Sequence, residues 1–194
     1  VLVHLEVGMS TGSYLMAAMR LAPVQCAAWG HPVTTGSDMI DCYFSCAPME
    51  PAGGAGHYSE QVVLLDGIGV DLALPDMHPG LQRADLGLPA AGHLYFCPQS
   101  LFKIHPEMDD LLVKILAADT QAVLVFFQGG SRAVTLAFAE RLTARIRAAG
   151  LEARGQVKFL PRLDGITFRR ALAAADVVLD TLHWSGGGTS LDAL

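Results

Sequence analysis

The sequence predicts an α/β protein built on parallel sheets, because short apolar runs alternate with helical segments along most of the chain. The runs at residues 94–97, 122–127 and 177–179 are only a few residues long, which is typical of buried parallel strands. Segments of helical length separate them, as in right-handed βαβ units. A glycine-rich turn follows the last run and precedes a helix start, an arrangement that favours anion binding at the carboxyl edge of a sheet.

The first part of the chain is expected to contain four short strands and one helix. Residues 13–21 have helical composition, with Ser10 or Thr11 as the N-cap, and Pro23 prevents the helix from continuing. Residues 47–56 are rich in Pro, Gly and Ala and are expected to form a surface loop. The expected strands are residues 1–5, 24–29, 39–46 and 62–65.

The second part has a more regular pattern. Residues 71–91 are proline-rich and lack a clean hydrophobic period, so we place a linker at residues 76–91, between domains at residues 1–75 and 92–194. The expected strands are residues 94–97, 122–127, 156–160 and 177–179, and the expected helices are residues 107–118, 133–149 and 167–174.

Composition excludes several functional classes. The formal net charge is −6 and no basic cluster occurs, which argues against nucleic acid as a partner. The longest apolar runs are far shorter than the roughly 20 residues that span a bilayer, so no membrane association is expected. The chain begins without Met and stops one turn into a helix, so we expect a piece of a longer protein, incomplete at both ends.

The cysteines and histidines do not predict a metal site. Cys42 and Cys46 have a CxxxC spacing, but no second Cys pair or close His pair accompanies them. We therefore favour buried, reduced thiols in a cytoplasmic protein, with no metal. Metal-ligand spacing is absent from the histidines at positions 4, 57, 78, 93 and 105.

The glycine-rich turn is the first candidate binding element. Glycine allows the backbone to approach a phosphate closely, and Thr189 and Ser190 are candidate N-caps of the helix that follows. Asp192 on the first helical turn is placed to accept hydrogen bonds from sugar hydroxyls. The turn matches neither the Walker A pattern nor GxGxxG, and a connection that only turns a corner remains an alternative. The glycines are Gly186, Gly187 and Gly188.

Further candidates follow other strands. Gln99 and Lys103 come after the run at 94–97, so they are expected at the same sheet edge as the glycine turn, where a Gln amide pairs with a base or phosphate and a Lys suits a diphosphate. The backbone of Leu163 is a candidate contact for a nucleobase. A solvated loop lysine is the alternative for Lys103. The loop after residues 24–29 adds candidate acceptor or cleft residues, namely His31, Thr34 and Thr35.

Four segments together resemble the catalytic region of family 41 glycosyltransferases, the O-GlcNAc transferase and SPINDLY-like enzymes, whose many bacterial members carry tetratricopeptide repeats upstream. The front portion looks equally similar to the bacterial cytoplasmic N-glycosyltransferases. The segments occur in the family's order and are RLAPVQCAAWGHPVTTGSDMID (20–41), YFCPQSLFKIHPEMDDLLVKIL (95–116), RLDGITFRRALAAADVVLDTLHW (162–184) and SGGGTSLDAL (185–194).

The resemblance implies a GT-B fold with two Rossmann-like domains. It implies an inverting, metal-independent transfer of a sugar, GlcNAc or glucose, from a UDP-sugar to a protein Ser or Thr. Gln99 matches the donor-binding Gln, Lys103 the catalytic, diphosphate-binding Lys, Leu163 the uracil-contacting turn, and Asp192 the ribose-binding Asp. Gly187, Gly188 and Thr189 replace a His-Thr-Thr run, which leaves backbone groups and Thr189 for phosphate.

Other functions remain open alongside this one. They are a GT-B enzyme acting on Asn, glycan or lipid acceptors, a GT-B epimerase, and a non-catalytic module that binds a nucleotide-sugar or a partner. The resemblance implies that the family's catalytic-site histidines lie upstream of Val1 and that the helices closing the second domain lie beyond Leu194. The segment by itself is therefore expected to be inactive or nearly so. Exposed sheet edges also predict self-association.

Overall fold

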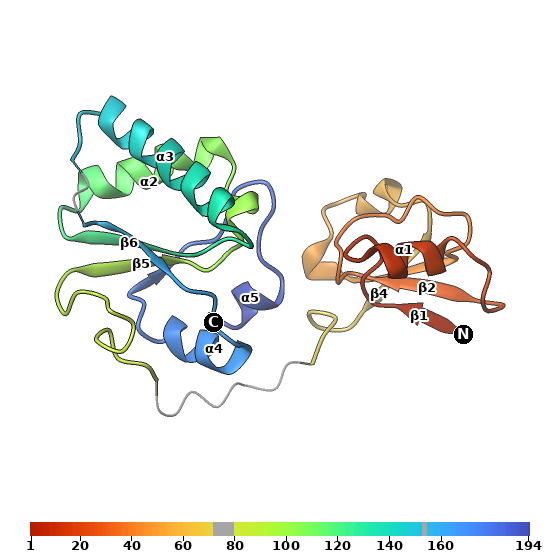
Figure 1. Cartoon of the computed structure of the whole chain (residues 1–194). Helices are drawn as coiled ribbons and strands as arrows, with labels where there is room; N and C mark the ends of the chain where they lie inside the picture. The colour runs from red at the N-terminus through yellow and green to blue at the C-terminus, as the bar shows by residue number, and fades with distance from the viewer. Residues whose placement is uncertain (72–79, 153–154) are drawn as a thin grey trace. The chain divides into compact units, whose positions relative to one another are not determined.

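The computed structural model describes residues 1–71, 80–152 and 155–194. The chain forms two compact units, Val1–Ala73 and Leu74–Leu194, each built around a parallel sheet (Figure 1). The α/β class and the parallel sheets predicted from the alternation of strands and helices are confirmed. The division lies close to the predicted end of the first domain at residue 75.

The first unit has its strands in the order β1-β2-β3-β4, and every neighbouring pair is parallel. Cys42 lies opposite Cys26 on one side and Gln61 on the other, which fixes the register of the central strands. Two short 3-10 helices, η1 (Ala47–Met49) and η2 (Gly54–His57), occupy the segment expected to be a loop. The strands are β1 (Leu2–His4), β2 (Gln25–Ala28), β3 (Cys42–Cys46) and β4 (Gln61–Leu65).

Helix α1 (Thr11–Ala17) begins and ends earlier than the predicted 13–21. Ser10 caps it by accepting a hydrogen bond from Ser13 N at 3.1 Å, as one of the two predicted caps. The buried Gln25 side chain accepts from Leu21 N and donates to Met19 O, so residues 19–21 form a turn instead of a last helical turn. Ala17 packs with Ala27 and Tyr43 and so joins α1 to the sheet.

The second unit has the strand order β7-β6-β5-β8, again parallel throughout. Its helices match prediction to within two residues. Helix α4 starts two residues early because Asp164 Oδ1 accepts from Ile166 N and Thr167 N, an N-cap that fixes the first turn. The elements are β5 (His93–Cys97), α2 (Pro106–Ala118), β6 (Ala122–Phe127), α3 (Arg132–Ala148), β7 (Val157–Leu160), α4 (Gly165–Leu172), β8 (Val177–Val178) and α5 (Gly188–Leu191).

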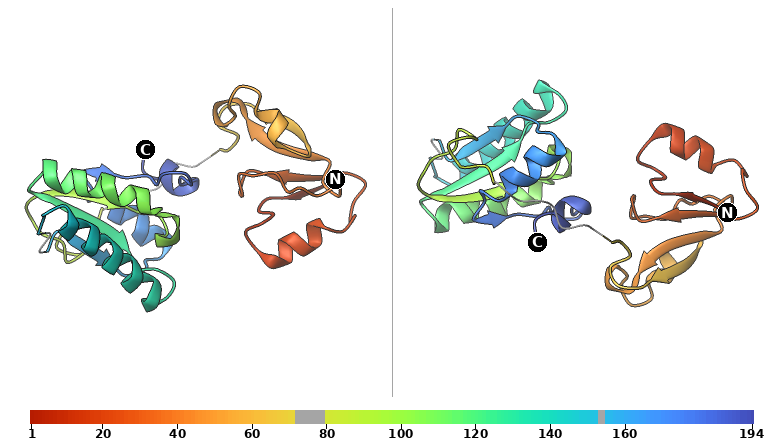
Figure 2. Two further views of the ribbon diagram at one scale, coloured as in Figure 1. Left: turned by 90° about the horizontal axis from the view of Figure 1, so that it is seen from above. Right: turned by 90° about the horizontal axis from the view of Figure 1, so that it is seen from below.

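The second sheet is covered on both faces. Helices α2 and α3 lie side by side over one face, and α4 lies on the opposite face (Figures 1 and 2). Every residue of β6 is buried, as expected of a central strand. Phe126 packs under α3 against Phe138, while Phe127 packs against Phe168 of α4.

The described part of the predicted linker, residues 80–91, is packed onto the second unit, so the linker prediction is wrong there. Leu88 is buried with β5 and β6. Arg83 donates to Gly92 O at 2.8 Å and forms an ion pair with Asp176 at 2.7 Å. A segment without periodicity can still be fixed by one apolar anchor and one arginine. Residues 76–79 of the prediction lie outside the described residues.

Candidate functional site

The strand order of the second unit defines a topological switch point between β5 and β8. The chain leaves β5 toward β6 and β7, then returns to β8 on the other side of β5. In open α/β sheets, ligands bind outside the carboxyl ends of the strands at such a point. The loops that leave β5 and β8, residues 98–105 and 179–187, therefore meet at the expected ligand-binding edge.

Gln99 joins these two loops. Its side chain is almost fully buried, and Nε2 lies 3.5 Å from Ser190 Oγ. A Cβ atom placed on Gly186 would overlap both the Gln99 amide and Ser190 Oγ, so only glycine permits this approach. The structure thus brings together three residues predicted to belong to one site.

Asp180 organises the glycine-rich loop, and the sequence analysis missed it. Its Oδ1 accepts from Gly186 N and from Thr181 N, both at 2.8 Å, while Oδ2 accepts from Ser190 Oγ at 3.0 Å. One carboxylate therefore fixes the start of the loop, its first glycine and the helix that follows. Asp180 directly follows the predicted strand at residues 177–179, and this position could have identified it as a site residue.

Lys103 extends across the same edge. It is half-buried, and its Nζ lies 3.5 Å from both Gln99 Oε1 and Ser185 O. Among the residues that the structure describes, no carboxylate forms an ion pair with it. The ammonium charge is therefore held by long contacts to neutral oxygens, which leaves it suited to an anionic ligand.

A cavity of about 450 Å³ continues the site toward β6 and β7. Gln99 and Leu163 both line it, which places the predicted nucleobase contact beside the predicted donor-binding amide. The loop after β6 also lines it through Gly129, Gly130 and Ser131, and the sequence analysis missed these residues. Two consecutive glycines directly after a strand were the signal that would have found them.

The predicted N-caps of the last helix are wrong. Helix α5 begins at Gly188, its N-cap is Gly187, and no side chain caps it. Thr189 and Ser190 lie inside the helix because the Ser190 hydroxyl donates to Asp180 instead of capping. Asp192 is the C-cap residue, one position beyond the first turn on which it was expected.

The candidate residues of the first unit form a separate network. Glu60 is buried and accepts hydrogen bonds from Thr34 Oγ1 at 2.7 Å, from Thr35 N at 2.7 Å and from Thr35 Oγ1. Burial acts to raise the pKa of Glu60, but the bonds from Thr35 and Thr34 outweigh it, so this pKa lies below its ordinary value. His31 packs against Gly8, and its carbonyl accepts from Tyr43 Oη at 2.7 Å. The two threonine hydroxyls therefore hold the loop after β2 to the start of β4.

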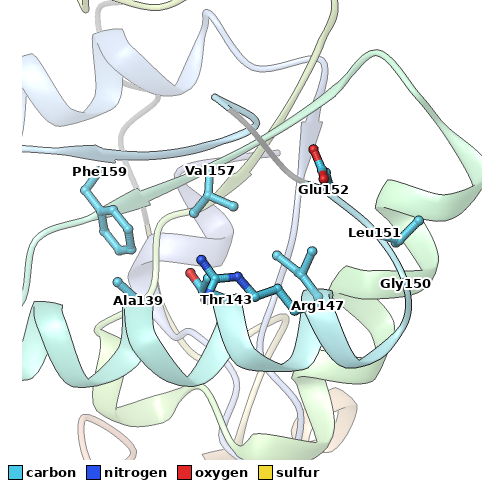
Figure 3. A pocket seen from close by; sticks show the side chains of 9 residues that line it. Ala139, Thr143, Arg147, Gly150, Leu151, Glu152, Val157 and Phe159 are labelled. Atoms are coloured by element: carbon cyan, nitrogen blue, oxygen red, sulfur yellow. The ribbon is translucent and has the colours of Figure 1, made fainter.

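A larger pocket, of about 680 Å³, lies between α3 and β7 (Figure 3). Thr143 and Arg147 of α3 line it with Val157 and Phe159 of β7. None of the predicted site residues lines this pocket. Size alone does not make it the functional site, since the polar groups converge at the carboxyl edge instead.

Cys97 lies under the candidate site at the end of β5. Burial raises the pKa of its thiol to about 11, so the sulfur is not a thiolate near neutral pH. The described cysteines are all free thiols, as predicted. Covalent catalysis by Cys97 is therefore not supported.

Comparisons with known proteins find similar sequences and folds among glycosyltransferases. The chain is 28% identical over 186 residues, 91% of its length, to the probable UDP-N-acetylglucosamine–peptide N-acetylglucosaminyltransferase SEC of Arabidopsis thaliana, of which it spans 18%. Its structure matches a mutant form of Thermobaculum terrenum O-GlcNAc transferase with a TM-score of 0.77 and 25% identity, over the whole chain and 36% of that protein. No protein-family model matches.

The fold is an α/β architecture of parallel sheets flanked by helices, and it is shared with a glycosyltransferase of the GT-B type. More narrowly, the chain is similar to part of a plant SEC protein and to part of a bacterial O-GlcNAc transferase. It spans well under half the length of either relative. No helix in the described residues is both long and apolar enough to cross a bilayer.

Proposed function

We propose that the protein containing this chain transfers a sugar from a UDP-sugar to a protein Ser or Thr, and that the second unit binds the donor. The observation that carries the proposal is the meeting of Gln99, Lys103 and the glycine-rich loop at the switch point. The named activities of the plant and bacterial relatives support it. GlcNAc is the sugar that the plant relative's name favours, and glucose is the alternative.

The proposed donor orientation follows the site. The uracil lies in the cavity beside Leu163 and Gln99. The diphosphate lies between Lys103 and the backbone of Gly187, Gly188 and Thr189, since Gly186 N already donates to Asp180. Asp192 is proposed to accept from the ribose hydroxyls. This arrangement uses a cation and backbone N–H groups for the phosphates, the groups that P-loop-like turns also use.

In the proposed reaction, the acceptor hydroxyl attacks the anomeric carbon on the face opposite the diphosphate. The carbon–oxygen bond to UDP breaks as the new glycosidic bond forms, and the configuration inverts. The proton of the acceptor hydroxyl passes to solvent. Lys103 stabilises the negative charge that develops on the departing diphosphate, an interaction commonly worth about 3 kcal/mol, or roughly a hundredfold in rate. No metal takes part in this proposed step.

The experiment that tests the proposal is calorimetric titration of the full-length protein with UDP, first without metal and then with Mg²⁺. We expect binding without metal, and we expect Lys103→Ala to weaken it at least tenfold and nearly abolish transfer. Lys114→Ala is the matched control, because Lys114 is an exposed lysine of α2 outside the site. Mass spectrometry of a Ser/Thr peptide and of its Asn counterpart then identifies the acceptor.

Each outcome discriminates between functions. Equal UDP affinity in the Lys103 and Lys114 variants would remove Lys103 from the site. UDP binding without a change in peptide mass would favour an epimerase, a glycan or lipid acceptor, or a binding module. No binding under either condition would favour the interaction module alone. The cytoplasmic location and self-association stay predictions, which fractionation and light scattering test.

A further inference from the structure

Three exposed side chains gather where the two loops of the switch point meet the start of α2. His105, Glu107 and His183 each offer one ligand atom, and these atoms lie within 4.8 Å of one another. His183 Nε2 lies 2.7 Å from Glu107 Oε2, and His105 Nδ1 lies 4.0 Å from Glu107 Oε1. The two imidazole rings pack edge to face at 5.0 Å. His183 is 76 residues from Glu107, so sequence spacing did not reveal this cluster.

His183 reaches the cluster through a strained backbone. Its φ is +68°, and it is the only residue other than glycine with positive φ among those described. Trp184 N donates to Leu182 O at 2.8 Å across it, which makes His183 the centre of a γ-turn of the rare, positive-φ form. Thr181 Oγ1 donates to Trp184 O at 2.6 Å and closes the turn. Such strain persists where the surroundings impose it, and it is concentrated at functional sites.

The other two side chains are fixed by the start of a helix. His105 is the N-cap of α2, with its Nδ1 accepting from Glu107 N at 3.3 Å, and Glu107 lies in the first turn. The backbone positions of all three ligand groups are therefore set by local structure, whereas their exposed side chains remain free to adjust. An exposed histidine–carboxylate pair alone would require neither an N-cap histidine nor a positive-φ turn.

We propose that His105, Glu107 and His183 form a binding site for a divalent transition-metal ion, of which Zn²⁺ is the best fit. Two imidazoles and one carboxylate are a ligand set that zinc uses, with water in the fourth position. Bonds of 2.0–2.1 Å place tetrahedral ligand atoms about 3.4 Å apart, so adjustments of roughly 1 Å in exposed side chains complete the site.

A metal ion here would tie together the loops that follow β5 and β8. His105 is two residues after Lys103, and His183 is three residues before Gly186. The ion would hold these loops in the arrangement in which Gln99 and Ser190 meet. This inference concerns loop positioning and does not depend on the proposed transfer reaction, in which no metal takes part.

The test is a titration of tag-free, full-length protein with Co²⁺, which substitutes for Zn²⁺ and reports coordination by its visible absorption. We expect one site per chain with nitrogen and oxygen ligands and no thiolate-to-cobalt charge-transfer band. His183→Gly is the informative variant, because glycine keeps the positive-φ turn while it removes the imidazole. We expect His183→Gly, His105→Ala and Glu107→Gln each to weaken binding at least tenfold.

His93→Ala is the matched control. His93 Nδ1 lies 2.7 Å from Asp119 Oδ2 in another exposed histidine–carboxylate pair, and among the described residues this pair belongs to no three-residue cluster of metal-ligand type. We expect this variant to bind Co²⁺ as the parent does. Zn²⁺ is also expected to raise the melting temperature of the parent but not of His183→Gly, since a ligand stabilises only the state that binds it.

The proposal is overturned if no saturable binding occurs up to roughly 1 mM Co²⁺, the limit of weak specific association. It is also overturned if His183→Gly binds as tightly as the parent, or if His93→Ala loses as much affinity as His183→Gly. A thiolate charge-transfer band would assign the ion to cysteines instead. UDP binding is measured separately, so failure here leaves the proposed function intact.

Discussion

Gly186 is the residue on which the meeting of the two site loops depends. The space that a Cβ would need there is filled by the Gln99 amide and Ser190 Oγ. A Cβ atom placed on Gly188, two residues later, would have no heavy atom within 4 Å. Glycines in one short run thus have different structural roles, and the sequence of three consecutive glycines does not distinguish these roles.

This difference predicts opposite effects of two alanine substitutions. Gly186→Ala should cost about 1–3 kcal/mol of unfolding free energy, because it forces Gln99 or Ser190 to move. Gly188→Ala should be neutral or stabilising by up to about 1 kcal/mol, since alanine favours the helix that starts there. Denaturant unfolding of both variants checks this, and equal destabilisation would contradict the assigned contact. UDP affinity should fall at least tenfold in Gly186→Ala.

At the scale of elements, helices α2 and α3 are joined by two arginine–aspartate pairs of different burial. Asp109 is almost fully buried and accepts from Arg141 Nε at 2.8 Å and from Nη2 at 3.0 Å. Arg141 Nη2 also donates to Ile104 O at 2.8 Å, which fixes the start of α2 beside the site. Asp110 and Arg145 form a similar pair in which both side chains are about half exposed.

We predict that removal of the two carboxylates has unequal consequences. Asp109→Ala should destabilise the second unit by about 3 kcal/mol, because it leaves the arginine charge without its buried partner. Asp110→Ala should produce little measurable change, since exposed ion pairs are screened by solvent. Urea midpoints of the two variants, compared with the parent, are the measurement. Similar losses in both would show that burial does not determine the strength of this contact.

At the scale of the whole molecule, the two units have separate cores and each contains one tryptophan, Trp29 and Trp184. Glu60 belongs to the first unit and holds the loop after β2 to the start of β4. Its pKa is below the ordinary value of 4.5, so the folded unit binds this proton less readily than the unfolded chain. Its contribution is therefore present above pH 4.5 and is lost as the pH falls below it.

We predict that Glu60→Gln destabilises the first unit selectively, by about 1–3 kcal/mol at neutral pH, because a charged acceptor of three hydrogen bonds becomes neutral. Trp184→Phe leaves Trp29 as the reporter of the first unit, and Trp29→Phe leaves Trp184 as that of the second. Fluorescence-detected unfolding should shift only the Trp29 signal. The stability difference between parent and Glu60→Gln should shrink below pH 4.5, and a difference that persists at low pH would contradict the role of this carboxylate.

The sequence by itself determined the class of fold, most of the strands and helices, and the placement of Gln99, Lys103 and the glycine-rich loop at the carboxyl edge. Those features depend on hydrophobic periodicity and turn residues, which act within a few positions along the chain. It erred at the linker and at the caps of α5, where Leu88 and Asp180 make distant contacts that outweigh local preference.

The tertiary structure alone decided which of these residues meet. Gln99 and Ser190 are separated by 91 positions, and Glu107 and His183 by 76. The chain returns to β8 beside β5, which brings both pairs together. The local sequence pattern does not predict that strand order. The exclusion of a side chain at Gly186 arises for the same reason, because the Gln99 amide that fills the space comes from a loop distant in sequence.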